Sequence, residues 1–223
     1  MGEDRRTAGF LRMIDELHAR HLVGVADVRE VWLIRHADAY WGLESLAEGV
    51  VDPPLSERGR DQADRLARRL AAVPLHAIWS SELRRALETA EAIARGRRLV
   101  VRPDARLREV RTHWDDGRVP ERLPPGSYPF PEPEAEVAAR MRSVVADVVT
   151  DLAGVEAPTP RAAVVTHNAA IAVYLSSVLG LHWGQLRVMP QFTSVSVMAV
   201  KDDQVVIQSI ADATHLSFGA AEK

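Results

Sequence analysis

Apolar residues along the chain occur either in short continuous runs or at helical spacing, and the two patterns alternate. Short apolar runs that end in polar residues predict strands, and these lie at 30–37, 76–81, 99–102 and 161–168. Apolar positions three and four residues apart predict helices at 4–22, after Ser56 as an N-cap, and at 82–95, 134–153 and 169–180. Two final apolar runs, 194–200 and 204–210, flank a polar turn and predict a hairpin.

Strands that alternate with helices predict an α/β fold, a three-layer α/β/α sandwich with a mostly parallel central sheet. No linker divides residues 30–223, which we expect to form one domain after an N-terminal helical extension, residues 1–29. The apolar side of this extension, with Phe10 and Leu17, is expected to pack on the same domain; contact in a homodimer is the alternative. Residues 111–133 are rich in proline, and a loop of this length predicts a lid.

Composition excludes several classes of protein. The 223 residues carry 28 basic and 31 acidic side chains, a net charge of −3, which argues against a nucleic-acid partner. The absence of cysteine excludes disulfides, cysteine-based zinc sites, iron–sulfur clusters and thiol catalysis. No apolar run reaches the roughly 20 residues that span a bilayer, and the charged N-terminus is unlike a secretory signal. A cytoplasmic protein without a membrane partner is expected.

Polar side chains with catalytic potential follow the ends of the predicted strands. In open α/β sheets the ligand lies beyond the carboxyl ends of the strands. The residues at or after these ends include Arg35, His36, Arg84, Arg85, Glu109 and His167. The arginine fork pairs with phosphate oxygens, a histidine nitrogen can attack phosphorus, and a carboxylic acid can protonate the leaving oxygen. This set predicts a site for a phosphorylated small molecule.

Blocks in one order along the chain carry a family resemblance. They read LIRHADA (33–39), PPLSERGRDQA (53–63), SSELRRALETA (80–90), LREV (107–110) and VVTHNAAI (164–171). In these motifs the sequence resembles the histidine phosphatase superfamily, also called phosphoglycerate mutase-like, over about residues 30–180. The resemblance implies the three-layer fold of that family for the domain, with no metal and no cofactor.

The resemblance also implies roles for five residues. His36 is the nucleophile that becomes phosphohistidine, and Arg35 and Arg85 bind the phosphate. His167 donates to the phosphoryl oxygens, and Glu109 protonates the leaving group and then activates water. The register of the third block favours Arg85 over its neighbour Arg84, which we expect to be exposed. Three carboxylates compete with Glu109 for the acid role, namely Asp104, Asp115 and Asp116.

Four positions depart from the family pattern. Ala37 and Asn168 each replace the glycine that follows a histidine, and Ala39 and Gly42 stand where many members have Thr and Asn. The last two changes remove a hydroxyl and an amide from the expected phosphate contacts, and Asn168 is expected to alter the backbone after His167.

A phosphomonoester hydrolase is the function that we expect from these features. The stretch between Glu109 and the helix at 134 is short, whereas mutases of the family typically carry a longer insertion that encloses the substrate. The alternatives are a phosphoglycerate mutase-type transfer, a protein-phosphohistidine phosphatase with a more open cleft, and a catalytically inactive binding protein.

Overall fold

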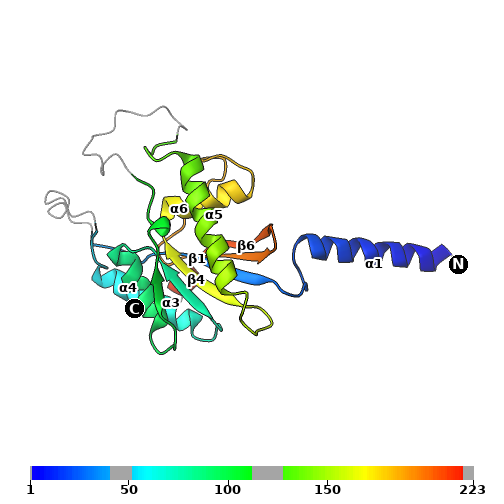
Figure 1. Cartoon of the computed structure of the whole chain (residues 1–223), viewed down its shortest axis with the longest axis horizontal. Coiled ribbons are helices and arrows are strands. Elements are labelled where there is room, and N and C mark those ends of the chain that lie inside the picture. The colour runs from blue at the N-terminus through cyan, green and yellow to red at the C-terminus, as the bar shows by residue number, and fades with distance from the viewer. Residues whose placement is uncertain (1, 41–51, 112–127, 218–223) are drawn as a thin grey trace.

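The computed structural model describes residues 2–40, 52–111 and 128–217, and its centre is a six-stranded sheet, part of which is labelled in Figure 1. The strands lie in the order β3-β2-β4-β1-β5-β6. Their bounds are β1 Arg29–Arg35, β2 Ala77–Ser80, β3 Val101–Pro103, β4 Arg161–Thr166, β5 Val195–Lys201 and β6 Gln204–Asp212. The first four pair in parallel and the last two antiparallel, so the predicted mostly parallel sheet and the terminal hairpin are confirmed.

Helices cover both faces of the sheet, because consecutive side chains of the central strands point to opposite faces and are apolar on both. Leu33 of β1 belongs to a core cluster with α5 and α6, whereas its neighbour Ile34 belongs to a cluster with α3 and α4. The helix bounds are α1 Gly2–Arg20, α3 Glu57–Leu70, α4 Arg84–Ala94, α5 Glu134–Asp151 and α6 Asn168–Val178, with short 3-10 helices η1 Ala105–Leu107 and η2 Thr214–Leu216. These layers confirm the α/β/α sandwich.

Helix α3 is fastened to the loop that follows β1. Ser56 caps the helix as the sequence predicts, because its Oγ accepts from the Gly59 N–H at 2.9 Å and donates to the Asp38 carboxylate at 2.7 Å. A Cβ on Gly59 would lie 1.9 Å from the Asp38 carbonyl oxygen, so only glycine allows this approach. Gln62 accepts from the Asp38 N–H at 2.9 Å. The chain directly after His36 is therefore held by the N-cap and the first two turns of α3.

Helix α1 projects away from the sheet (Figure 1), and the expectation that its apolar side packs on the same domain is wrong. Phe10 is 58% exposed and Leu17 is 48% exposed. The reason lies in the chain that follows, where Leu22 and Val28 pack against Ala199 of β5 and so anchor the segment after the helix instead of the helix itself. The homodimer contact stays a prediction.

The predicted lid loop 111–133 is described only in part, because residues 112–127 lie outside the described residues. Tyr128, Phe130 and Trp183 pack edge to face, with ring centroids 5.3 to 5.9 Å apart. All three adjoin the core cluster of α5 and α6. The end of the loop is thus packed onto the domain.

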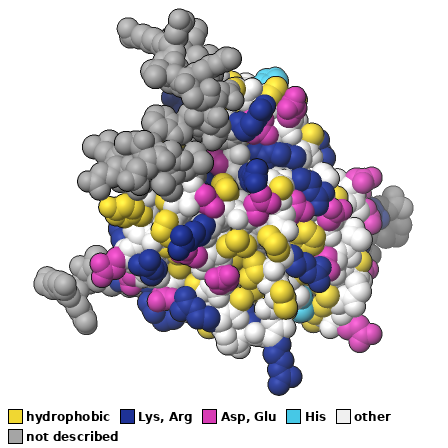
Figure 2. Space-filling model, turned by 60° about the vertical axis from the view of Figure 1, so that its left-hand side comes forward, with side chains coloured by type: hydrophobic (Ala, Val, Ile, Leu, Met, Phe, Trp, Pro, Cys, Tyr) yellow, Lys and Arg dark blue, Asp and Glu magenta, His cyan; other side chains and the backbone are white. Residues whose placement is uncertain are grey.

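On the face shown in Figure 2, basic and acidic side chains lie interspersed, with apolar side chains between them. None of the helices in the described part of the chain is both long and apolar enough to cross a membrane.

Candidate active site

The two histidines lie side by side because the strands that carry them are neighbours. Arg35 of β1 pairs in parallel register with Thr166 of β4, so the next residue on each strand, His36 and His167, leaves the sheet at the same edge. The His36 N–H donates to the Thr166 carbonyl at 2.9 Å, and the two ring centroids are 4.9 Å apart. His36 is 4% exposed and His167 is fully buried.

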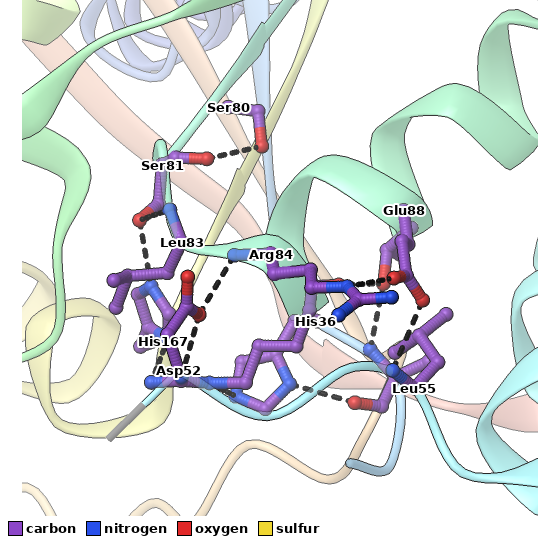
Figure 3. A network of polar contacts seen from close by, with 12 residues as sticks. His36, Asp52, Leu55, Ser80, Ser81, Leu83, Arg84, Glu88 and His167 are labelled. Atoms are coloured by element: carbon purple, nitrogen blue, oxygen red, sulfur yellow. Dashed lines mark hydrogen bonds and ion pairs between the residues drawn. The ribbon is translucent and has the colours of Figure 1, made fainter. Parts of the chain in front are cut away.

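Arg85 joins the two rings from the first turn of α4. Its Nε donates to His36 Nε2 at 3.3 Å, and its Nη2 lies 3.3 Å from His167 Nδ1. Arg85 is 4% exposed, and its Nη1 lies 3.7 Å from a carboxylate oxygen of Asp52. Arg84 instead turns outward, with its side chain 61% exposed and paired with Glu88 at 2.8 Å. Of the two candidate arginines, Arg85 is the one that lies among the histidines, while Figure 3 shows Arg84 beside Glu88.

The hydrogen bonds of His36 define its protonation. Nδ1 lies 2.7 Å from the Ala37 carbonyl oxygen, which only accepts, so Nδ1 carries the proton. Nε2 accepts from Arg85, which only donates, so Nε2 presents a lone pair. Burial, together with the charges of Arg85 and Arg35, lowers the pKa of His36 to about 3. The imidazole is therefore neutral near pH 7, with the unprotonated nitrogen turned toward the arginine.

Arg35 is oriented by the segment before β5. Its Nη1 donates to the Pro190 carbonyl at 2.8 Å, and its guanidinium carbon lies 3.9 Å from the centre of the Phe192 ring. That ring also lies against His36, at 5.7 Å between centroids. Phe192 thus holds both residues in place, a role that the sequence does not reveal because the aromatic residue is in a connecting segment without a motif.

Glu109 lies at the N-terminus of α6. Its carboxylate accepts from the N–H groups of Val110 at 2.9 Å, Ala170 at 3.1 Å and Ala169 at 3.4 Å. Desolvation raises the pKa of Glu109, and the three N–H groups and the charge of Arg85 oppose this shift in part. A raised pKa increases the fraction of the carboxyl group that carries a proton, which suits a general acid.

An ion pair between a half-buried arginine and a buried glutamate fixes the loop that carries Glu109. Arg140 of α5 donates to the carbonyls of Arg106 at 2.7 Å and Arg108 at 2.8 Å, and it pairs with Glu132 at 2.7 Å. The Arg111 N–H donates to the same Glu132 carboxylate at 2.9 Å. The sequence gives no sign of this support, since its parts lie up to 34 residues apart.

The carboxylates that compete with Glu109 are placed elsewhere or not described. Asp104 pairs with Arg106 at 2.6 Å and caps η1. Asp115 and Asp116 lie outside the described residues.

Three of the four departures from the family pattern lie among the described residues, and the local backbone accommodates them. The Ala37 N–H donates to the Thr89 hydroxyl at 3.0 Å, and that hydroxyl donates to the Arg85 carbonyl at 2.7 Å. Ala39 forms an isolated bridge with Leu55. Asn168 is the first residue of α6, with no left-handed backbone that would need a glycine. Gly42 lies outside the described residues.

The sequence does not predict the contacts that two hydroxyl residues, Ser81 and Thr89, make in the site. Ser81 Oγ lies 2.9 Å from His167 Nε2, and Thr89 connects the backbones of Ala37 and Arg85. Both lie inside the block SSELRRALETA, so the motif contains them, but only the fold shows what they touch.

Among the described residues no three His, Asp or Glu side chains converge as a set of metal ligands.

Comparisons with known proteins cover most of the chain. The sequence pattern of the histidine phosphatase superfamily, branch 1, matches residues 31–213. A probable phosphoglycerate mutase GpmB from Cronobacter sakazakii is 30% identical over 215 residues, which cover 87% of this chain and 98% of that protein. Among solved structures, Bacillus stearothermophilus YhfR has a TM-score of 0.67 and 27% identity, and covers 84% of this chain and 99% of its own. A mycobacterial glucosyl-3-phosphoglycerate phosphatase has a TM-score of 0.66 and 27% identity, and the match covers 81% of this chain and 97% of that protein.

Proposed function

The chain belongs to the histidine phosphatase superfamily, branch 1, and from this premise we propose that it hydrolyses a phosphomonoester through a phosphohistidine on His36. The single observation that carries the proposal is the geometry of His36 Nε2, an unprotonated nitrogen 3.3 Å from the Arg85 guanidinium. A nucleophile needs a free lone pair, and a phosphoryl group needs fixed positive charge around its oxygens. His36 Nε2 has the lone pair, and the Arg85 guanidinium supplies the positive charge beside it.

In the first step, His36 Nε2 forms a bond to phosphorus as the bond from phosphorus to the leaving oxygen breaks. Glu109 gives its carboxylic proton to that oxygen, so the product leaves as a neutral alcohol. Arg85 exchanges its bond to Nε2 for phosphoryl oxygens, and Arg35 binds them as a second cation. The Nδ1–H bond to the Ala37 carbonyl, 2.7 Å long, stabilises the ring when it becomes positively charged.

In the second step, a water oxygen attacks phosphorus and the bond from Nε2 to phosphorus breaks. The Glu109 carboxylate takes a proton from that water, so inorganic phosphate leaves, and the imidazole and the carboxylic acid return to their initial states. The mechanism uses no metal ion.

A phosphoglycerate mutase-type transfer is the second candidate, and the printed name of the Cronobacter relative favours it. The glucosyl-3-phosphoglycerate phosphatase among the structural neighbours favours hydrolysis. The two reactions share the phosphohistidine and differ in whether water or a second substrate accepts the phosphoryl group. The short stretch between Glu109 and α5 supports hydrolysis, because a longer insertion would enclose the intermediate.

The decisive experiment measures phosphate release from p-nitrophenyl phosphate, with and without EDTA, for the wild type and His36→Ala. We expect wild-type activity that EDTA does not change and a loss of at least about 10³-fold in the variant, because the covalent route is removed. Mass spectrometry of the acid-labile phosphoenzyme should place the phosphoryl group on the peptide that contains His36. Dependence on an added divalent metal, or full activity in His36→Ala, would refute the proposal.

The same preparation separates the alternatives. A mutase would convert 3-phosphoglycerate in the presence of a bisphosphorylated primer without releasing phosphate. An inactive binding protein would bind phosphate but form no phosphohistidine.

A further inference from the structure

Ser81 is a buried hydroxyl residue that the steps proposed for His36 and Glu109 do not use. It follows β2 and is fully buried, and its N–H donates to the Val165 carbonyl of β4 at 2.8 Å. Its Oγ lies 2.9 Å from His167 Nε2 and accepts from the Leu83 N–H at 3.3 Å (Figure 3). The hydroxyl is therefore fixed against one edge of the His167 ring.

The opposite edge of the ring fixes where its proton lies. Arg85 Nη2 is 3.3 Å from His167 Nδ1, and a guanidinium only donates, so Nδ1 accepts. A neutral ring with a lone pair on Nδ1 carries its proton on Nε2, and this proton points to Ser81 Oγ. The lone pair of His167 thus lies on the side of Arg85, the residue that also contacts the His36 nucleophile.

The surroundings of His167 keep it neutral while no anion is bound. In the described part of the chain, the charged and titratable groups that act on the pKa of His167 are His36 and Arg35 from the end of β1, Arg85 from α4 and Arg140 from α5. Burial and these basic neighbours hold the pKa of His167 well below its usual range. A neutral ring with a lone pair on Nδ1 cannot donate to a phosphoryl oxygen from that atom, so the proton for that bond has to come from elsewhere.

We propose that Ser81 is a positioning residue that holds Nε2–H of His167, so that Nδ1 takes up the proton of a phosphomonoester monoanion. The proton leaves a phosphoryl oxygen and joins Nδ1 as Nδ1 gives up its hydrogen bond from Arg85 Nη2. Nδ1–H then donates back to that oxygen, so the substrate becomes a dianion and the ring an imidazolium. Ser81 Oγ accepts from Nε2–H before and after the transfer and stabilises the positive ring. This inference rests on the proposed function, and it specifies the ionic form of the substrate that the site selects.

The first test uses inorganic phosphate as the probe and needs no catalysis. Nitrogen-15 NMR of the full-length protein at pH 7, with His167 assigned from a His167→Gln spectrum, reports the protonation of each ring nitrogen. Without phosphate we expect one protonated nitrogen, Nε2, and with saturating phosphate we expect both to be protonated. A proton on Nδ1 in the free protein, or a ring that stays neutral with phosphate bound, would overturn the inference even if the enzyme is active.

The second test compares Ser81→Ala with a matched control. Ser80→Ala removes a neighbouring hydroxyl that is equally buried but bonds the Ser81 carbonyl at 2.9 Å instead of the histidine. Wild-type kcat/KM should fall above the second pKa of the substrate, about 6 for phosphate monoesters, and should follow that pKa when the substrate is changed. Ser81→Ala should lower kcat/KM by about tenfold or more below that pKa and less above it, since the bond that orients the proton acceptor is lost.

Ser81→Thr keeps the hydroxyl and should restore the pH profile, and Ser80→Ala should leave it unchanged. A loss in Ser81→Ala that is equal at every pH and matched by Ser80→Ala would show a merely structural role. Should the wild type form no phosphohistidine at all, the proposed function fails, while the NMR of the phosphate complex still shows whether His167 takes up a proton from the bound anion.

Discussion

The site at the strand ends and helix α1 both depart from the usual distribution of side chains, in which apolar groups are buried and polar groups are exposed. The site buries charged and polar side chains, with His36 and Arg85 each 4% exposed and His167 fully buried. Helix α1 exposes apolar side chains, with Phe10 58% exposed. Burial of a polar group is unfavourable unless it is bonded, so each ring in the site has partners on both nitrogens, whereas the exposed apolar side of α1 has no such compensation within the domain.

The family pattern covers only one of these two regions. The family pattern begins at residue 31, after α1, and the Cronobacter relative is covered over 98% of its length by 87% of this chain. The difference between the two regions teaches that the site is fixed by the register of neighbouring strands, while α1 lies outside the matched residues and follows only its local helical pattern. Mutations in the site should therefore change chemistry strongly, and mutations in α1 should change little in the domain.

The largest expected effect comes from Arg85. Arg85→Ala should lower kcat/KM by about 10³-fold or more, because it removes the guanidinium between the two rings and the expected ligand of the phosphoryl oxygens. Arg85→Lys should recover only part of this loss, since an ammonium group cannot bond in the planar fork. Steady-state kinetics with p-nitrophenyl phosphate measure both.

Arg84→Ala is the matched control, because Arg84 is adjacent, has the same charge and is 61% exposed in its side chain. We expect its kcat/KM to stay within about twofold of the wild type, as for other surface substitutions. Equal losses at the two positions would contradict the distinction that the structure draws between them.

These two arginines illustrate how far sequence reasoning reaches. The order of strands and helices, the rule on strand ends and the motif register together predict that His36, His167 and Arg85 meet, because each lies at or beside the end of a strand. The contacts of Ser81, Phe192 and Arg140 were not predicted, since a hydroxyl, an aromatic ring or a half-buried arginine finds its partner only when distant segments pack. The packing of α1 was predicted wrongly for a related reason: helical periodicity shows which side is apolar but not what covers it.

The next largest effect is expected at Glu109. Glu109→Gln keeps the size of the side chain but cannot release a proton, so it should lower kcat by about 10²-fold on an alkyl phosphate and by less on p-nitrophenyl phosphate, whose leaving group needs little protonation. Parallel assays with the two substrates measure the ratio. If both rates fall by the same factor, Glu109 is not the acid. Retained wild-type rates would point to a different carboxylate.

A smaller effect concerns stability and pH. The pKa of His36 is lowered to about 3 in the folded chain, against about 6.5 when unfolded. Between these values the unfolded chain binds a proton that the folded chain does not, so this contribution to stability is present above pH 6.5 and is lost as the pH falls toward 3. Between pH 6 and 5 the free energy of unfolding should drop by about 1 kcal/mol more in the wild type than in His36→Asn, as urea titrations measure. Parallel pH dependences in the two proteins would contradict the shift.

The smallest effect is expected in α1. The double substitution Phe10→Ser and Leu17→Ser replaces side chains that are already 58% and 48% exposed, so kcat/KM should change by less than about twofold, and the free energy of unfolding by about 0.5 kcal/mol or less. Leu33→Ala is the matched contrast, because it removes a fully buried side chain of β1 and should destabilise the domain by about 3 kcal/mol.

Sedimentation of the wild type and the double variant tests the predicted homodimer. If α1 forms the dimer contact, the wild type has the mass of two chains and the double variant has the mass of one. A large loss of unfolding free energy in the double variant without a change in mass would show that α1 packs on its own domain after all.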